Sequence, residues 1–108
     1  MKKLTPYQTK KYDIDQKIVW ELADLESRQM LFSIVRQSKK PADISSATKI
    51  PPSTVYSKLK TLNDLSLAYV EKTELEDGHK IKYFKSRIKG AYISISKQKP
   101  KLILVKNA

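Results

Sequence analysis

The amino-acid sequence predicts an α+β fold in which helices come first and β-hairpins follow. From Ile14 to Leu62 apolar residues recur at spacings of three and four, the period of a helix with one buried face. After Leu67 the pattern changes to short runs of β-branched and aromatic residues around the turn sequence Asp77-Gly78. With 108 residues the chain has the size of one domain. We therefore expect a basic N-terminal arm over residues 1–12, one domain over residues 13–90 and a β-rich extension over residues 91–108.

Two helices are expected before residue 40. Ile18, Leu22 and their apolar neighbours predict a helix from about residue 13 to residue 23, with a strand over part of this segment as the alternative. Asp24 can cap a second helix, because its carboxylate accepts hydrogen bonds from the free N–H groups of the first turn. We expect this second helix to end near Ser38. Its apolar face would consist of Met30, Leu31, Ile34 and Val35, with Phe32 beside them.

A tight turn separates the next two helices. A short helix over residues 41–48 would show the core only Ile44 and Ala47. Pro51 and Pro52 interrupt the helical pattern, because proline has no backbone N–H and pushes the preceding residue out of the helical region. Pro52 can still occupy a first helical position, so a longer helix is expected from residue 52 to about residue 65. One side of it carries Val55, Leu59 and Leu62, and the opposite side carries Ser53, Ser57, Lys60 and Asp64.

Two hairpins are expected in the second half of the chain. Residues 67–86 form the first, because strand-type residues flank Asp77-Gly78 and the second arm alternates Ile81 and Tyr83 with lysines. The segments AYISIS (91–96) and KLILV (101–105), joined by KQKP, form the second. A helix over part of residues 86–96 is the alternative, because Gly90 is the only obvious helix breaker there.

The net charge of +11 is unevenly distributed along the chain. Residues 13–26 carry a net charge of −4 and residues 65–77 carry −3, whereas residues 78–108 contain nine basic residues and no acid. Basic blocks of this kind favour a nucleic acid as partner. No apolar segment approaches the roughly 18 residues that a membrane span requires, so no membrane partner is expected. The first residues lack the apolar stretch of a secretory signal, so we expect a cytoplasmic protein.

Catalytic and metal sites are not expected in this chain. It contains no cysteine, which excludes disulfides, thiolate metal sites and cysteine nucleophiles. His79 is the only histidine, so no second histidine can join it as a metal ligand. The sequence shows no nucleophile with an activating base and no glycine-rich phosphate loop. We therefore expect a binding protein without a cofactor, and not an enzyme.

The order helix, short helix, tight turn, helix and hairpin is the layout of a winged helix-turn-helix domain. The stretch DISSATKIPPSTVYSKLKTLNDLSLAYVEK resembles the winged helix-turn-helix DNA-binding domains of prokaryotic regulators of the ArsR and TrmB type, especially small archaeal ones. The resemblance covers about residues 24–86. It rests on Asp43-Ile44 in the short helix, on Ser-Thr-Val-Tyr at 53–56 and on the Leu-containing corner at 65–70. Lys49 and Ser66 stand where glycine is common in the family, and both can adopt a positive φ at modest cost.

The resemblance implies a sequence-specific, double-stranded DNA-binding transcriptional regulator that acts as a homodimer. The helix over residues 52–65 would enter the major groove, and the wing over residues 67–86 would contact the flanking backbone or the minor groove. The KLILV segment is the best candidate for the dimer surface, although it is equally suited to close the core of a monomer. A winged-helix protein interaction module of a transcription assembly and a nonspecific architectural DNA binder are the alternatives.

Three sets of residues are expected to contact the DNA. Short polar side chains and one lysine would read bases, namely Ser53, Thr54, Ser57, Lys60 and Thr61. The sugar-phosphate backbone would be held by Arg36, Lys39, Lys40, Lys49, Tyr56 and Lys58. The wing would contribute His79, Lys80 and Lys82 from its second arm, because acidic residues precede its tip. For Tyr56 the alternative is packing against the preceding helix, and for Lys58 it is a solvated side chain.

Overall fold

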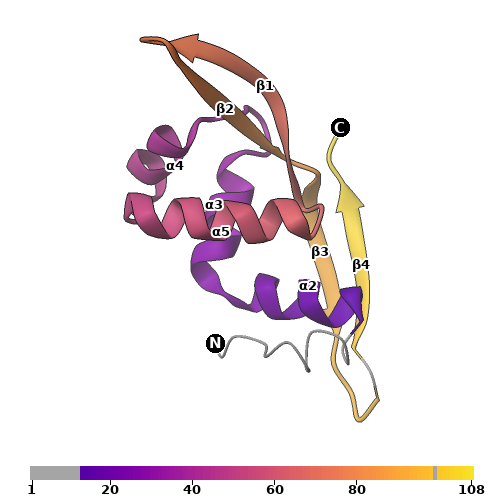
Figure 1. The fold of residues 1–108 in the computed structure, drawn as a ribbon. Coiled ribbons are helices and arrows are strands. Elements are labelled where there is room, and N and C mark those ends of the chain that lie inside the picture. The colour runs from indigo at the N-terminus through magenta and orange to yellow at the C-terminus, as the bar shows by residue number, and fades with distance from the viewer. Residues whose placement is uncertain (1–12, 99) are drawn as a thin grey trace.

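The computed structural model describes residues 13–98 and 100–108, and the expected basic arm over residues 1–12 lies outside the described residues. In this part of the chain four helices are followed by four strands, which pair into two separate antiparallel hairpins. The helices form the centre, and the two hairpins extend from it in opposite directions (Figure 1). The expected α+β fold is confirmed. None of the described helices is long and apolar enough to cross a membrane.

The first two helices are α2 (Ile14–Ala23) and α3 (Leu25–Ser33), and an aspartate caps each of them. The Asp13 carboxylate accepts a hydrogen bond from the Gln16 backbone N–H at 3.0 Å, and the Asp24 carboxylate accepts one from the Ser27 N–H at 3.0 Å. Asp24 has extended backbone angles and is both the C-cap of α2 and the N-cap of α3. The helix expected over residues 13–23 and the capping role of Asp24 are therefore confirmed.

Helix α3 ends at Ser33, well before the expected end at Ser38. The residues that follow it bond to the first hairpin instead of continuing the helix. The Ser86 N–H donates to the Ile34 carbonyl at 3.0 Å, and Lys39 and Phe84 exchange two backbone hydrogen bonds at 3.0 and 2.9 Å. The expected end was wrong because the bonds that terminate α3 come from residues distant in the sequence. Ile34 is nevertheless fully buried, as its apolar spacing predicted.

Helices α4 (Pro41–Thr48) and α5 (Pro52–Asp64) match the expected segments, and each begins with a proline. One expectation for α4 was wrong, because Ala47 is exposed and Pro41 is buried beside Ile44. Residues 41 and 44 lie on the same side of the helix, whereas residue 47 lies about 120° from residue 41 around the axis. The core-facing side of α4 is therefore centred between Pro41 and Ile44.

The turn between α4 and α5 requires a left-handed residue, and Lys49 supplies it with a φ of 64°. The Ser45 hydroxyl donates to the Ile50 carbonyl at 2.6 Å and holds the two sides of the turn together. At the other end of α5 the chain turns through Ser66, which has a φ of 59°. Lys49 and Ser66 are the two positions at which the family that this sequence resembles commonly has glycine. The structure thus accepts non-glycine residues in both turns.

The first hairpin pairs β1 (Ala68–Glu76) with β2 (His79–Ser86), as expected from the sequence. Asp77 and Gly78 form its two-residue turn with φ values of 51° and 80°. Positive φ at both central residues matches the right-handed twist of paired strands, which explains why Asp-Gly closes this hairpin.

The second hairpin pairs β3 (Ile88–Ser94) with β4 (Lys101–Lys106), so the helix alternative for residues 86–96 is wrong. Strand β3 begins before residue 91, where the β-rich extension was expected to start. Its first residue, Ile88, is buried in the helical core, and Ala91 and Leu102 pack against that core. The second hairpin is thus continuous with the core through Ile88.

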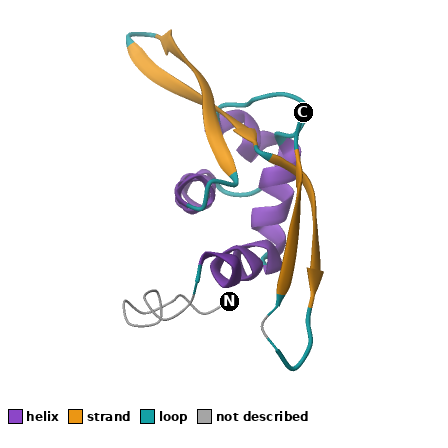
Figure 2. Cartoon of the chain, turned by 90° about the vertical axis from the view of Figure 1, so that its right-hand side faces the viewer, coloured by secondary structure: helices purple, strands orange, loops and turns teal. Residues whose placement is uncertain are grey.

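One hydrophobic core joins the four helices and the beginnings of β1 and β3. Its buried side chains are Ile18, Leu22, Met30, Leu31, Ile34, Ile44, Ile50, Val55, Leu59, Leu62, Leu67, Ala68 and Ile88. Figure 2 shows α5 on one side of the helical layer and the second hairpin on the other. One face of α5 therefore rests on the core, and its opposite face is left to the solvent.

Candidate nucleic-acid interface

The outward face of α5 is polar and open. Val55, Leu59 and Leu62 hold the helix on the core, as its apolar spacing predicted. Of the residues expected to read bases, Ser53, Ser57 and Lys60 are exposed, whereas Thr54 and Thr61 are half-buried. The Thr61 hydroxyl donates to the Ser57 carbonyl at 3.4 Å, which directs it along the helix. The three exposed side chains therefore define the accessible part of this face.

The first turn of α5 presents backbone N–H groups to the solvent. Pro52 has no N–H, and no side chain caps this helix. The N–H groups of Ser53 and Thr54 precede the first intrahelical bond, which runs from the Val55 N–H to the Pro51 carbonyl at 3.0 Å. Free N–H groups and the positive end of the helix dipole favour an anion at this position.

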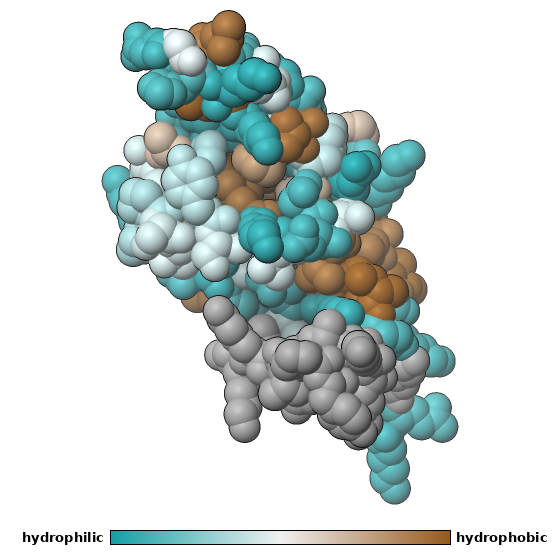
Figure 3. All heavy atoms as spheres, viewed as in Figure 1, coloured by the Kyte–Doolittle hydropathy of each residue, from teal (hydrophilic) through white to brown (hydrophobic). Residues whose placement is uncertain are grey.

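A groove of about 360 Å³ separates α5 from the first hairpin. Its floor is apolar, and three lysines and a tyrosine stand around it. The lining residues are Pro41, Tyr56, Leu59, Lys60, Asn63, Val70, Lys80, Ile81, Lys82 and Phe84. Apolar side chains are visible between the polar surfaces of α5 and the hairpin in Figure 3. The structure thus brings four of the expected contact residues, Tyr56, Lys60, Lys80 and Lys82, around one depression without an acid among its lining residues.

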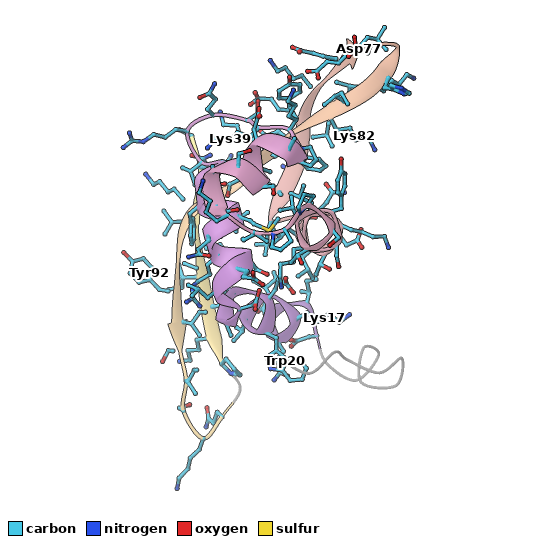
Figure 4. The ribbon with its side chains drawn as sticks, turned by 90° about the vertical axis from the view of Figure 1, so that its left-hand side faces the viewer. Lys17, Trp20, Lys39, Asp77, Lys82 and Tyr92 are labelled. Atoms are coloured by element: carbon cyan, nitrogen blue, oxygen red, sulfur yellow. The ribbon has the colours of Figure 1, made fainter. Side chains whose placement is uncertain are left out.

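Tyr56 is 64% exposed, so it is not packed into the core beneath the preceding helix. Lys49 is also exposed, in the turn that precedes α5. Arg36 and Lys39 lie apart from the groove and line a second depression of about 430 Å³ together with Phe32 and Lys89. In Figure 4 Lys39 and Lys82 stand on opposite sides of the first hairpin. The expected backbone contacts therefore fall on two separate surfaces.

Lys40 is bound to the first hairpin by an ion pair. Its ammonium lies 3.0 Å from Oε2 of Glu76, and the Tyr83 hydroxyl donates to Oε1 of the same carboxylate at 3.0 Å. These hydrogen bonds lower the pKa of Glu76, and the carboxylate in turn raises the pKa of both Lys40 and Tyr83. The contact holds the hairpin beside the start of α4 and partly neutralises Lys40.

Lys58 joins α5 to the junction of α2 and α3. Its ammonium lies 2.6 Å from Oδ2 of Asp24, with only 22% and 26% of the two side chains exposed. The hydrogen bond from Lys58 lowers the pKa of Asp24 from 3.8 to about 2, with smaller contributions from Ser27. Ser27 is fully buried, and its hydroxyl donates to Asp24 at 2.8 Å and to Glu21 at 2.6 Å as alternatives. Lys58 is thus part of the packing of three helices.

No family model matches the chain, and no curated protein sequence matches it. Among solved structures the chain is similar to the homodimeric winged helix-turn-helix DNA-binding domain of a possible ArsR-family transcriptional regulator from Mycobacterium bovis. The two are 18% identical with a TM-score of 0.56, covering 83% of this chain and 77% of that one. The fold is a winged helix-turn-helix. NolR from Sinorhizobium fredii is similar to the same degree, with 19% identity, a TM-score of 0.56 and coverage of 80% and 81%.

In the terms of this fold, α4 and α5 are the helix-turn-helix and the first hairpin is the wing. His79, Lys80 and Lys82, the expected wing contacts, are all exposed on β2. His79 pairs across the tip with Glu76. The wing also carries its own cation contacts, because the Lys72 ammonium lies 4.7 Å from the centre of the Tyr83 ring. Within the described residues no group of three or more potential metal ligands comes together.

Sequence reasoning missed several residues of the groove between α5 and the wing. Asn63 lies on α5 one turn after Lys60, and its spacing could have placed it on the same face. Val70 and Phe84 line the groove from the wing, but their positions depend on how the wing folds back on α5. The ion pairs of Lys40 and Lys58 were also missed. Their partners lie 36 and 34 residues away, and no local spacing rule connects them.

Proposed function

We propose that this chain is a sequence-specific, double-stranded DNA-binding transcriptional regulator that acts as a homodimer. In this proposal α5 lies in the major groove, and the wing contacts the flanking backbone or the minor groove. The observation that carries it is the exposed polar face of α5, joined by the groove to lysines of the wing. The similarity to a homodimeric DNA-binding domain of the same fold supports both parts of the proposal.

Base reading is assigned to the outward face of α5. Ser53 and Ser57 are short enough to let the helix approach the base edges, and Lys60 can reach a guanine or a phosphate. Thr54 and Thr61 border this face and are expected to contribute at its edges. Asn63 is added to the set, because an amide can bond to adenine with both of its polar atoms.

Backbone binding is assigned to residues around the same surface. Lys49, Tyr56, Lys80 and Lys82 are the contacts, with His79 nearer the tip of the wing. The N–H groups at the start of α5 can bind a phosphate as well. Arg36 and Lys39 would reach only a more distant part of the duplex. Lys40 and Lys58 contribute less than their charge suggests, because each already pairs with a carboxylate.

Selection of bound sequences from a pool of random duplexes tests the proposal directly. We expect an enriched palindromic site, which the chain binds more tightly than a scrambled duplex across a salt series. Equal affinity for every sequence would show a nonspecific architectural binder instead. Absence of binding even at low salt would favour the protein interaction module.

Two substitutions test the assignment of α5 to the groove. Ser57→Glu and Lys60→Glu each place a carboxylate on the exposed face, so both should abolish DNA binding while leaving the circular dichroism spectrum unchanged. Lys97→Glu is the matched control for Lys60→Glu, because it makes the same charge change, and a larger one than Ser57→Glu, at an exposed position in the loop between β3 and β4. Retained affinity in both α5 variants would show that another surface meets the DNA.

A further inference from the structure

We propose that the free edge of β4 is the homodimer interface, where two copies pair their β4 strands antiparallel and form one four-stranded sheet. The proposal rests on the homodimeric function proposed above and names the surface that joins the two copies.

Strand β4 has a pairing partner on one side only. It pairs with β3, and no other strand of the described chain lies against its outer edge. The outward N–H and C=O groups of an edge strand form a template for a further strand. Proteins that stay monomeric often place charges or proline within such edges, but β4 has its lysines at the two ends, Lys101 and Lys106. The residues between them, Leu102 to Val105, are all apolar.

Apolar side chains gather around this edge on both faces of the sheet. On the face turned away from the helices, Ile103 is 64% exposed and its cross-strand neighbour Tyr92 is 70% exposed (Figure 4). On the opposite face Ile93 and Leu104 remain 38% and 39% exposed. A partner strand added at the edge would cover parts of both faces, which no partner stacked on one face alone can do.

Charge distribution favours a second copy of this chain as the occupant. Helix α2 packs against β4 and carries Asp15 and Glu21 against one lysine, Lys17, with Asp13 as its N-cap. The hairpin over residues 88–106 contains five lysines and no acid. A two-fold dimer through β4 brings the acidic helix of each copy close to the lysine-bearing strand of its partner. Opposite charges then face one another across the interface.

The symmetry of an antiparallel edge pair also suits the binding of one duplex. Its two-fold axis runs perpendicular to the sheet, so the same face of both copies lies on one side of the dimer. In this chain the helices, α5 included, lie on one face of the β3–β4 sheet, and Tyr92 points from the other face (Figures 2 and 4). Both α5 helices therefore lie on one side, as a palindromic site requires. Stacking the outer faces would place them on opposite sides.

Repulsion between lysines selects the register of the pair. When the axis passes between Ile103 and Leu104, Lys101 lies opposite the partner's Lys106, and like charges in that position are unfavourable. When the axis passes through Ile103, Lys101 lies opposite the partner's Val105, and Leu102 lies opposite the partner's Leu104. The two Ile103 residues of the dimer then lie directly opposite one another. A six-residue strand spans only about 20 Å, so we expect a small interface and a dimer that dissociates on dilution.

A cysteine introduced into the cysteine-free chain tests this register. Ile103→Cys places two thiols across the axis with Cβ atoms about 5 Å apart, near the span of a disulfide. Tyr92→Cys is the matched control, because Tyr92 is similarly exposed but lies one strand farther from the axis. Its two copies would be three strand spacings apart, about 14 Å, which a disulfide cannot bridge. Under mild oxidation without DNA, we expect Ile103→Cys to cross-link at least about ten times faster, because pairing raises the local thiol concentration.

Light scattering on the unsubstituted chain gives a second measurement. We expect a dimer at high concentration, and Ile103→Glu should convert it to a monomer with an unchanged circular dichroism spectrum. A monomer at every concentration would overturn the proposal. Equal cross-linking rates at the two positions, or slow cross-linking at both, would overturn the β4 interface as well. These readouts involve no DNA, so failure of this interface and failure of DNA binding are distinguishable.

Discussion

The Asp24 carboxylate caps α3, pairs with Lys58 of α5 and accepts a hydrogen bond from the Ser27 hydroxyl. Asp24→Ala should therefore be among the most destabilising surface substitutions. Loss of the N-cap on α3 costs about 1 kcal/mol. Loss of the ion pair with Lys58 costs up to about 1 kcal/mol, since the pair is mostly shielded from solvent. The Ser27 hydroxyl keeps Glu21 as an acceptor, so no buried polar atom is stranded. The total of about 2 kcal/mol corresponds to a decrease in melting temperature of about 10 °C in a domain of this size.

Two partial substitutions separate the cap from the ion pair. Asp24→Asn keeps an oxygen that can cap α3 but removes the charge, and Lys58→Met removes only the ammonium. Urea unfolding of both single variants and the double variant gives the coupling energy of the pair, which we expect to be about 0.5–1 kcal/mol. If Lys58→Met unfolds at the same urea concentration as the unsubstituted chain, the ion pair contributes nothing and the reasoning is refuted.

The lowered pKa of Asp24 gives the same pair a dependence on pH. Above pH 3.8 the carboxylate is ionised in both the folded and the unfolded chain, and the stabilisation is fully present. As the pH falls toward about 2, the unfolded chain takes up the proton first, so the contribution to the free energy of unfolding is lost in this window. Asp24→Asn should therefore flatten the acid limb of the stability curve. A limb of unchanged slope would contradict the assigned pKa.

Three further predictions concern the turns and the lysines. Ser66→Gly should stabilise the fold by about 0.5–1 kcal/mol in urea unfolding, because glycine removes left-handed strain at this position; a loss of stability would show that Ser66 is unstrained. Lys60→Gln should reduce the slope of log affinity against log salt by about 0.9, the value of one phosphate contact, whereas Lys58→Gln should leave the slope unchanged. Equal changes would show that the ion pair of Lys58 opens on DNA. Glu76→Gln should release the Lys40 ammonium and raise DNA affinity up to about fivefold at low salt; unchanged affinity would place Lys40 away from the duplex.

Elements whose limits are set by local chemistry could be predicted from the sequence. Pro41 and Pro52 begin helices because a proline needs no hydrogen-bond acceptor in the first turn, and Asp77-Gly78 closes a hairpin because both residues tolerate positive φ. The end of α3 could not be predicted in this way. The residues after it, Ile34 and Lys39, bond to Ser86 and Phe84, whose positions exist only once the wing has folded.

The exposed face of α5 was predictable because helical periodicity places Ser53, Ser57 and Lys60 opposite the buried residues. The groove beside it was not, because it forms only when the wing lies against α5. The place of Tyr56 at this groove also depends on the tertiary arrangement, since Pro41 of α4 and Lys80 and Lys82 of the wing line the groove with it. Periodicity therefore predicts which residues of α5 are exposed, and the tertiary structure decides which residues of other elements lie beside them.

Basic residues on and near α5 cannot all be counted as phosphate contacts in the proposed complex with DNA. Lys58 and Lys60 are two residues apart on α5, and sequence reasoning assigned both to the DNA. The structure gives Lys58 a carboxylate partner at 2.6 Å and leaves Lys60 at the groove. Withdrawing Lys58 from Asp24 to meet a phosphate would exchange one short ion pair for another, so the net gain from such a contact is small. The dependence of DNA affinity on salt should consequently be shallower than the charge of +11 suggests.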